Sequence, residues 1–250
     1  MRIPISRPRR PRRRSRRARV AMALGAVVAL AAAYVFLWQP PLAVRIAAEM
    51  TPRILYRVAT DQKLVALTID DGPSAFTGRI LDRLAAHDAR ATFFLIGARA
   101  REHPELVQRI RAAGHEVGNH MMKDRPTVLF GTGRFEQELA RTERILGLDA
   151  HGPGKVFRPP SSWIRGPQLT VLERRGYRCV LGSVYPHDTK HRHAGLSAWY
   201  VLRKVRPGGI VILHEGAPSR RAILPILDRV LPELTRRGYR IVPVSELLAA

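Results

Sequence analysis

Short apolar runs alternate with helix-like patterns from residue 63 onward, and this alternation restricts the possible folds more than any other feature of the sequence. The runs are apolar throughout, which is typical of parallel strands covered on both faces. We predict strands at 64–69, 91–96, 115–118, 156–158, 179–181, 209–213 and 240–242. We predict helices between them at 78–87, 104–113, 134–146, 167–175, 197–205 and 221–237. The repeated β/α alternation favours an α/β fold, either a parallel barrel or a wound sheet.

Polar residues follow the predicted strands at their carboxyl ends. In parallel barrels and wound sheets these ends meet at one edge, where functional residues gather. Unrelated polar residues would scatter to both ends of the strands, so their concentration at one end predicts a single shared site. The residues are Asp70, Asp71, Asn119, His120, Arg158, Asp188 and His214.

Two adjacent carboxylates, Asp70 and Asp71, end the first predicted strand and precede a Gly-Pro turn. Neighbouring side chains of a strand point apart, so one carboxylate could bind a cation while the other accepts a proton from water. The alternative interpretation is a polar turn that caps the following helix.

His120 ends the third predicted strand, and Asp124 follows four residues later. Imidazole and carboxylate groups suit zinc or a similar divalent ion. A helical turn starting at His120 would bring residues i and i+4 to one face, which makes Asp124 a candidate ligand. Cys179 is the sole cysteine, so any metal site must use nitrogen and oxygen ligands.

Arg158 and His214 also end predicted strands. Two prolines follow Arg158 and stiffen the backbone, which would fix its guanidinium against a buried carboxylate such as Asp70. A purely structural ion pair is the alternative. His214 suits a general acid that protonates a leaving amine, and Asp188 could raise its pKa by pairing with it.

The N-terminal segment combines a basic tail with an uncharged run. The chain has a net charge of +23, and ten arginines fall within residues 1–19. Residues 20–38 carry no charge and would form a helix of roughly 28 Å, so we predict a transmembrane signal anchor. The basic tail would then be cytoplasmic and the domain extracytoplasmic, after a linker at 39–62. A cleaved signal peptide and secretion is the alternative. We expect no nucleic acid as partner, because the basic tail and the domain would lie on opposite sides of the membrane.

Taken in order, the segments around Asp70, His120, Arg158, Asp188 and His214 resemble the motifs of the polysaccharide deacetylases. This family is the NodB homology domain of carbohydrate esterase family 4. The resemblance extends over roughly residues 63–248, and we predict a domain of this kind at 63–250. It implies a distorted (β/α)7 barrel that binds one divalent metal, with zinc expected and cobalt or nickel as alternatives. The implied reaction is hydrolysis of N-acetyl groups on an amino-sugar polysaccharide, such as peptidoglycan or chitin-like oligomers.

The resemblance also implies a role for each matching residue. Asp70 would be the general base and Arg158 would orient it. Asp71 and His120 would hold the metal. Leu213 would line the acetate pocket, and His214 would be the general acid, tuned by Asp188.

Three motifs depart from the family pattern. Asp124 stands where the family has a second metal-binding histidine, which makes the motif His-x-x-x-Asp. Ser161 and Ser162 replace an aromatic-Gly pair, although the Ser161 N–H could still serve an oxyanion and Trp163 is a candidate to replace the ring. Thr189 replaces the tryptophan that usually follows the aspartate of the fourth motif. We therefore expect an altered substrate rather than lost activity.

Two other functions compete with deacetylation. The missing aromatic residues and Asp124 are also compatible with an inactive barrel that binds glycans. The same Asp-His site could instead hydrolyse other non-peptide C–N bonds, such as those of cyclic imides.

Overall fold

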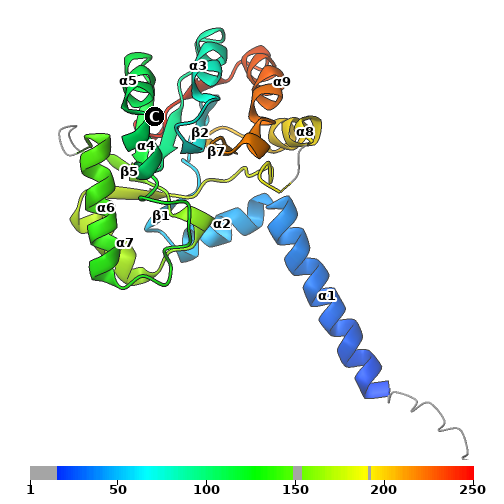
Figure 1. Cartoon of the computed structure of the whole chain (residues 1–250). Helices are drawn as coiled ribbons and strands as arrows, with labels where there is room; N and C mark the ends of the chain where they lie inside the picture. The colour runs from blue at the N-terminus through cyan, green and yellow to red at the C-terminus, as the bar shows by residue number, and fades with distance from the viewer. Residues whose placement is uncertain (1–15, 149–153, 191–192) are drawn as a thin grey trace, which may run out of the picture. The chain divides into compact units, whose positions relative to one another are not determined.

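The computed structural model describes residues 16–148, 154–190 and 193–250 (Figure 1). The chain divides into two compact units, Met1–Pro40 and Pro41–Ala250. The uncharged run at 20–38 lies within one helix, α1 (Arg16–Trp38). No helix among the described residues has both the length and the apolar character needed to cross a membrane. The predicted transmembrane span is therefore not supported, and most of the predicted basic tail lies outside the described residues.

The segment predicted as a linker, 39–62, contains two regular elements. These are helix α2 (Pro41–Met50) and the short strand β1 (Ile54–Leu55). Both residues of β1 are buried and pair with the strand that contains Cys179. The compact unit thus begins before residue 63, because β1 supplies part of its sheet.

A parallel sheet forms the centre of the second unit. Within the described residues it has eight strands in the order β1-β6-β5-β4-β3-β2-β7, with β8 paired to β2. Isolated bridges join Arg57 to Gly209 and Val184 to Val211, so β7 also contacts the segments that follow β1 and β6. The path therefore curls back on itself as an irregular barrel. The remaining strands are β2 (Leu64–Gly72), β3 (Thr92–Leu95), β4 (Glu116–Asn119), β5 (Lys155–Phe157), β6 (Tyr177–Val180), β7 (Gly209–His214) and β8 (Arg240–Val242).

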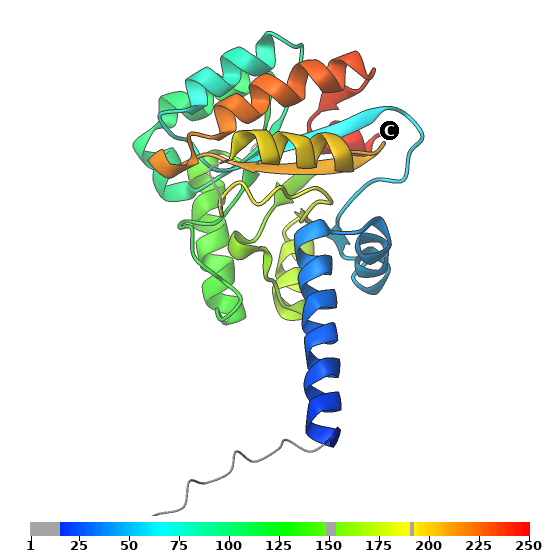
Figure 2. The same ribbon diagram turned by 90° about the vertical axis from the view of Figure 1, so that its right-hand side faces the viewer.

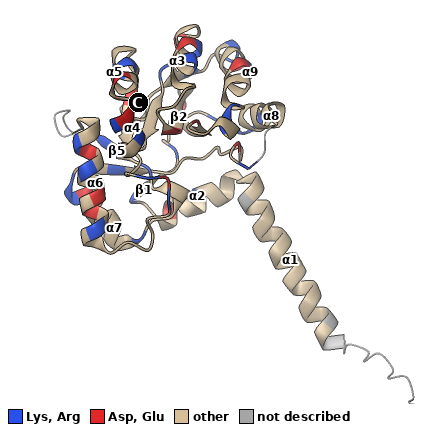
Figure 3. Ribbon diagram, in the orientation of Figure 1, with Lys and Arg blue, Asp and Glu red and all other residues tan. Residues whose placement is uncertain are grey.

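Helices cover the outside of this sheet. Helix α9 packs against α3 and α8, and Figure 2 shows α8 and α9 lying side by side over the sheet. Lys, Arg, Asp and Glu lie mainly on the helices, and the strands are mostly uncharged (Figure 3). The helices are α3 (Thr77–Ala85), α4 (Gly97–Glu102), α5 (Pro104–Ala112), α6 (Thr132–Leu146), α7 (Gly166–Arg174), α8 (Ala194–Lys204), α9 (Ile223–Arg236) and α10 (Val244–Leu248), with 3-10 turns η1 (Pro160–Ser162) and η2 (Pro218–Arg220).

One apolar cluster fills the inside of the curled sheet. Strands at both ends of the sheet path contribute to it, which the curvature makes possible. Strand β2 pairs with β3, β7 and β8 and is buried along its whole length. Its carboxyl end therefore presents polar groups at the rim of a packed core. The strand residues of the cluster are Leu55, Leu64, Ala66, Phe94, Val156, Val180, Ile210 and Val242.

The α/β fold with a parallel sheet is confirmed. All seven predicted strands and all six predicted helices are present, with boundaries that differ by a few residues at most. The prediction missed β1, α2, α4 and α10. Strand β2 also runs on through Gly72, because backbone pairing with β3 continues past a bulge at Asp71.

Candidate active site

The predicted residues gather at one rim of the sheet. Asp70 and His214 lie directly opposite each other in the pairing of β2 with β7. His120 and Arg158 directly follow β4 and β5, which are neighbours in the sheet. The expectation that strand ends bring these side chains together is thus confirmed.

Arg158 holds Asp70 in a buried ion pair. Its Nη1 donates to Asp70 Oδ1 at 2.6 Å and to Thr68 Oγ1 at 2.6 Å. The guanidinium carbon lies 4.3 Å from the centre of the Phe94 ring. Burial lowers the pKa of Arg158 while Asp70 raises it, and an arginine keeps its charge in either case. The contacts fix Asp70 through one oxygen and leave Oδ2 for other partners.

His214 is paired with Asp188 on one side and faces Asp70 on the other. Its Nδ1 lies 3.0 Å from Asp188 Oδ1, and its backbone N–H donates to Asp188 Oδ2 at 2.8 Å. Its Nε2 lies 3.8 Å from Asp70 Oδ2. Burial lowers the pKa of His214, but the charges of Asp188 and Asp70 outweigh it and raise the pKa overall. The structure thus brings Asp188 and His214 together as predicted, and the tuning of His214 as an acid stays a prediction.

His120 presents a lone pair to Asp71. Its Nδ1 lies 2.7 Å from the carbonyl oxygen of Arg158, which can only accept, so Nδ1 carries the proton. Burial lowers the pKa of His120 and outweighs the charge of Asp70, which raises it. The lowered pKa favours the neutral ring. Its Nε2 lies 3.3 Å from Asp71 Oδ1. Two acceptors that converge in this way fit a shared cation.

Asp124 does not join His120 and Asp71. Within the part of the chain that the structure describes, no three His, Cys, Asp or Glu side chains are arranged to hold a metal. Arg220 of η2 forms a close ion pair with Asp71 Oδ2, and its Nη2 lies 3.4 Å from Asp124 Oδ2. The predicted ligand set is therefore only partly assembled, because a guanidinium bridges the two carboxylates.

Known proteins with similar sequences identify the family. The family model described as polysaccharide deacetylase matches residues 57–180. A peptidoglycan-N-acetylglucosamine deacetylase of Bacillus cereus is 33% identical over 203 residues, which cover 80% of this chain and 95% of the relative. The chain belongs to the polysaccharide deacetylase family. It is thus a hydrolase of non-peptide carbon–nitrogen bonds.

Other members of the polysaccharide deacetylase family are similarly close. A chitooligosaccharide deacetylase of Sinorhizobium fredii is 34% identical over 201 residues, covering 76% of this chain and 94% of the relative. The solved Bc1960 peptidoglycan N-acetylglucosamine deacetylase has a TM-score of 0.75 and 30% identity, covering 80% of this chain and 95% of the other. A CE4 family pseudoenzyme from Bacillus anthracis has a TM-score of 0.71 and 28% identity, covering 78% and 68% respectively.

The three predicted substrate-binding residues of this polysaccharide deacetylase lie in different environments. Leu213 is fully buried and pairs with Ile69 beneath the rim. Ser161 is exposed, and the Trp163 side chain is 69% exposed. Trp163 is thus accessible to a polymer, whereas Leu213 supports the rim from below. Their binding roles stay predictions.

Strained backbone accompanies the motifs of this deacetylase. Non-glycine residues rarely adopt positive φ, and such strain concentrates at functional sites. Five residues with positive φ are candidate site residues themselves or lie next to one in the sequence. They are Asp71 (φ 67°), Met121 (φ 63°), Ser161 (φ 64°), Ser162 (φ 60°) and His187 (φ 55°).

Glu215 and Arg220 are site residues that the sequence analysis missed. Glu215 Oε2 accepts from Ser74 Oγ at 2.5 Å and Thr77 Oγ1 at 2.8 Å, which ties the loop after β2 to the end of β7. Burial raises the pKa of Glu215 to about 7. Its position directly after His214 was an available signal. Arg220 lies in the turn η2 beyond the end of β7, and no motif in the sequence marked it.

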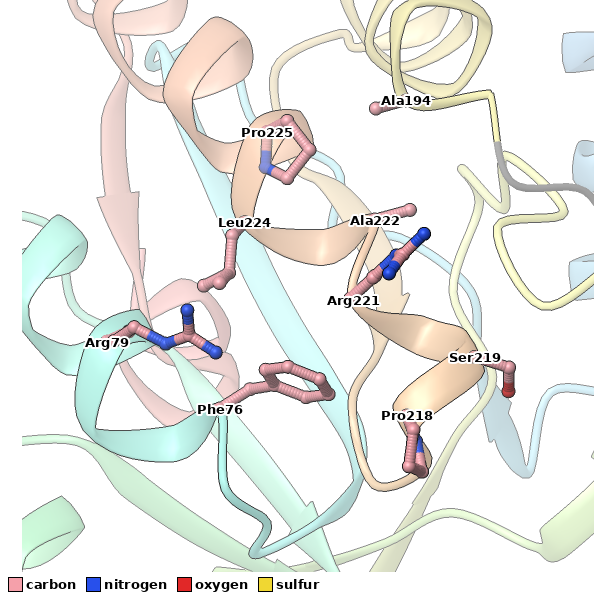
Figure 4. A pocket seen from close by; sticks show the side chains of 9 residues that line it. All are labelled: Phe76, Arg79, Ala194, Pro218, Ser219, Arg221, Ala222, Leu224 and Pro225. Atoms are coloured by element: carbon pink, nitrogen blue, oxygen red, sulfur yellow. The ribbon is translucent and has the colours of Figure 1, made fainter.

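The 3-10 turn η2 also borders a hollow of about 550 Å³ (Figure 4). Arg79 and Arg221 line it together with apolar side chains, and the Arg79 guanidinium lies 5.3 Å from the centre of the Phe76 ring. Asp70 and His214 are not among its lining residues. The hollow is therefore separate from the catalytic candidates of the deacetylase but shares the η2 segment with them. Its other lining residues are Ala194, Pro218, Ser219, Ala222, Leu224 and Pro225.

Proposed function

We propose that this deacetylase removes N-acetyl groups from an amino-sugar polymer of the cell envelope. The observation that carries the proposal is the buried array of Arg158, Asp70, His214 and Asp188. It places one carboxylate and one imidazole 3.8 Å apart, each fixed by a charged partner. Such a pair suits amide hydrolysis, which needs a base for water and an acid for the leaving amine.

The residues divide the reaction between them. Asp70 accepts a proton from the water that attacks the carbonyl carbon of the N-acetyl group. Arg158 holds the carboxylate through Oδ1, which leaves Oδ2 for the water. The protonated His214 then donates its Nε2 proton to the sugar nitrogen as the C–N bond breaks. Acetate and a free amine leave, with one water consumed.

Asp71 and His120 fit a divalent metal, because a carboxylate oxygen and an imidazole lone pair converge. Zinc suits this donor pair, with cobalt or nickel as alternatives. When bound, the ion would supply a Lewis acid for the acetyl carbonyl.

Among the possible polymers, the hollow favours an anionic one. Arg79 and Arg221 both line the hollow, and both are exposed to solvent. Guanidinium groups bind carboxylates well, and the peptides of peptidoglycan carry carboxylates whereas chitin-like oligomers are neutral. We therefore favour peptidoglycan as substrate. A cell-envelope substrate would place the domain outside the cytoplasm.

A substrate panel tests the proposal. The purified chain, supplied with zinc, is incubated with peptidoglycan and with chitooligosaccharides, and released acetate and new free amines are measured. We expect equal amounts of both products, with the larger yield from peptidoglycan. Binding of these glycans without release of acetate would instead support the alternative of a glycan-binding barrel.

A further inference from the structure

Arg220 contacts both carboxylates that were predicted as metal ligands. Its guanidinium contacts Asp71 Oδ2 and lies 3.4 Å from Asp124 Oδ2, and Nη1 also donates to the carbonyl oxygen of Glu215 at 3.3 Å. Its side chain is 21% exposed. The contacts link η2 to the two carboxylates that were predicted as ligands.

The charges make this arrangement and a three-ligand metal centre mutually exclusive. A guanidinium remains positive in proteins, so it repels a divalent ion at contact distance. Asp71 divides its oxygens between His120 and Arg220, and Asp124 has Arg220 as its described partner. Asp124 can therefore become a ligand only after Arg220 leaves it.

The segment that carries Arg220 is anchored at one end and loosely packed at the other. Gly216 adopts φ 103°, and a Cβ there would meet the Asp71 carbonyl and Arg99, so the start of the segment is closely packed. The turn η2 itself has no buried residue. Moving Arg220 outward would therefore expose little apolar surface.

We propose that Arg220 is a built-in counter-cation that competes with the divalent metal for Asp71 and Asp124. In the arrangement described, Arg220 neutralises both carboxylates. The metal binds when η2 withdraws the guanidinium, which frees Asp124 to complete the site. This inference concerns metal affinity in the absence of substrate, so it stands apart from the deacetylation proposed above.

Zinc titration calorimetry on the purified full chain tests the inference. We expect Arg220→Ala to bind zinc at least tenfold more tightly than the unmodified chain. Arg221→Ala is the matched control, because it removes the adjacent arginine, which lines the hollow instead. We expect its zinc affinity to stay within about twofold, which separates a local effect from the change in net charge.

A second pair of variants tests the role of Asp124. We expect Asp124→Ala to weaken zinc binding only slightly in the unmodified chain, because the loss of a ligand is offset by the loss of a contact that holds Arg220. Combined with Arg220→Ala, the same change should weaken zinc binding clearly. Arg220→Gln replaces Arg220→Ala if thermal unfolding shows that the alanine variant is not folded. An Arg220 variant that binds zinc no more tightly than the unmodified chain would overturn the inference. Failure of deacetylation would be seen separately, as absence of acetate with the zinc series intact.

Discussion

The buried pair of Arg158 and Asp70 sets the chemistry at the scale of single residues. Removing one partner of a buried pair leaves an uncompensated charge, which costs about 3–5 kcal/mol. We therefore expect Arg158→Ala to lower the free energy of unfolding by roughly that amount and to abolish acetate release. Urea denaturation and the acetate assay measure the two effects. The exposed Arg178 supplies the control Arg178→Ala, which should change neither. An Arg158→Ala variant of normal stability would contradict the role of the pair.

Asp188 should control the pH dependence of catalysis through His214. Because Asp188 and Asp70 raise the pKa of His214, the imidazole stays protonated to higher pH than an ordinary histidine. The stability gained from this raised pKa is complete below about pH 6.5 and is lost as pH rises through the folded value. We expect Asp188→Asn to shift the alkaline limb of the kcat/KM profile to lower pH. An unchanged alkaline limb would mean that His214 is not the acid.

Glu215 should make the fold less stable as pH rises. Its folded pKa of about 7 lies above the ordinary value of 4.5, so its contribution is complete below pH 4.5 and is lost between about pH 4.5 and 7. We expect Glu215→Gln to remove this loss, which amounts to roughly 3 kcal/mol or less at about 1.4 kcal/mol per pKa unit. Thermal unfolding at several pH values measures it. The exposed Glu105→Gln control should keep the dependence of the unmodified chain.

Residues at strand ends could be predicted from the strand pattern, and Asp188 from its motif, whereas Arg220 could not be predicted. Asp70, His120, Arg158 and His214 were found because parallel strands bring their carboxyl ends together whatever the loops do. Arg220 reaches the site from a turn, and its direction depends on tertiary packing. The same limit applies to the contact of Arg220 with Asp124, which the spacing of Asp124 from His120 could not show. The role of Asp124 as a ligand stays a prediction.

At the scale of elements, long apolar patterns were reliable and short elements were not. Helix α9 buries Ile223, Leu227, Val230 and Leu234 along one face, which is the helical spacing used to predict it. Strand β1 has two residues, too few to show any periodicity, and it was missed. The bulge that extends β2 through Gly72 is also invisible to periodicity, because it arises from pairing with a neighbouring strand.

The hollow beside η2 should favour an acidic polymer. We expect the combined Arg79→Ala and Arg221→Ala variant to raise KM for peptidoglycan roughly fivefold, as the loss of two exposed charge contacts implies. Its KM for neutral chitooligosaccharides should change little, which makes this substrate the control. Steady-state acetate release on both substrates measures the difference. Equal effects on both would remove the hollow from the account of substrate preference.

At the scale of the whole molecule, the fold and the family followed from the order of the motifs. The sheet brings five segments that are distant in the sequence to one rim. The order of these segments along the chain therefore indicated the family better than any single motif did. The N-terminal segment was different. The uncharged run correctly indicated a helix, but the structure does not support the membrane span inferred from it.

The most direct test of the central claim is acetate release from peptidoglycan by the Asp70→Asn variant. Asparagine keeps the shape of the side chain but cannot take a proton from water. We expect kcat to fall by roughly 10²–10⁴-fold, the usual contribution of general base catalysis. Asp228→Asn, at an exposed carboxylate paired with Arg83, is the matched control and should keep full activity. Undiminished acetate release by a folded Asp70→Asn variant would contradict the account.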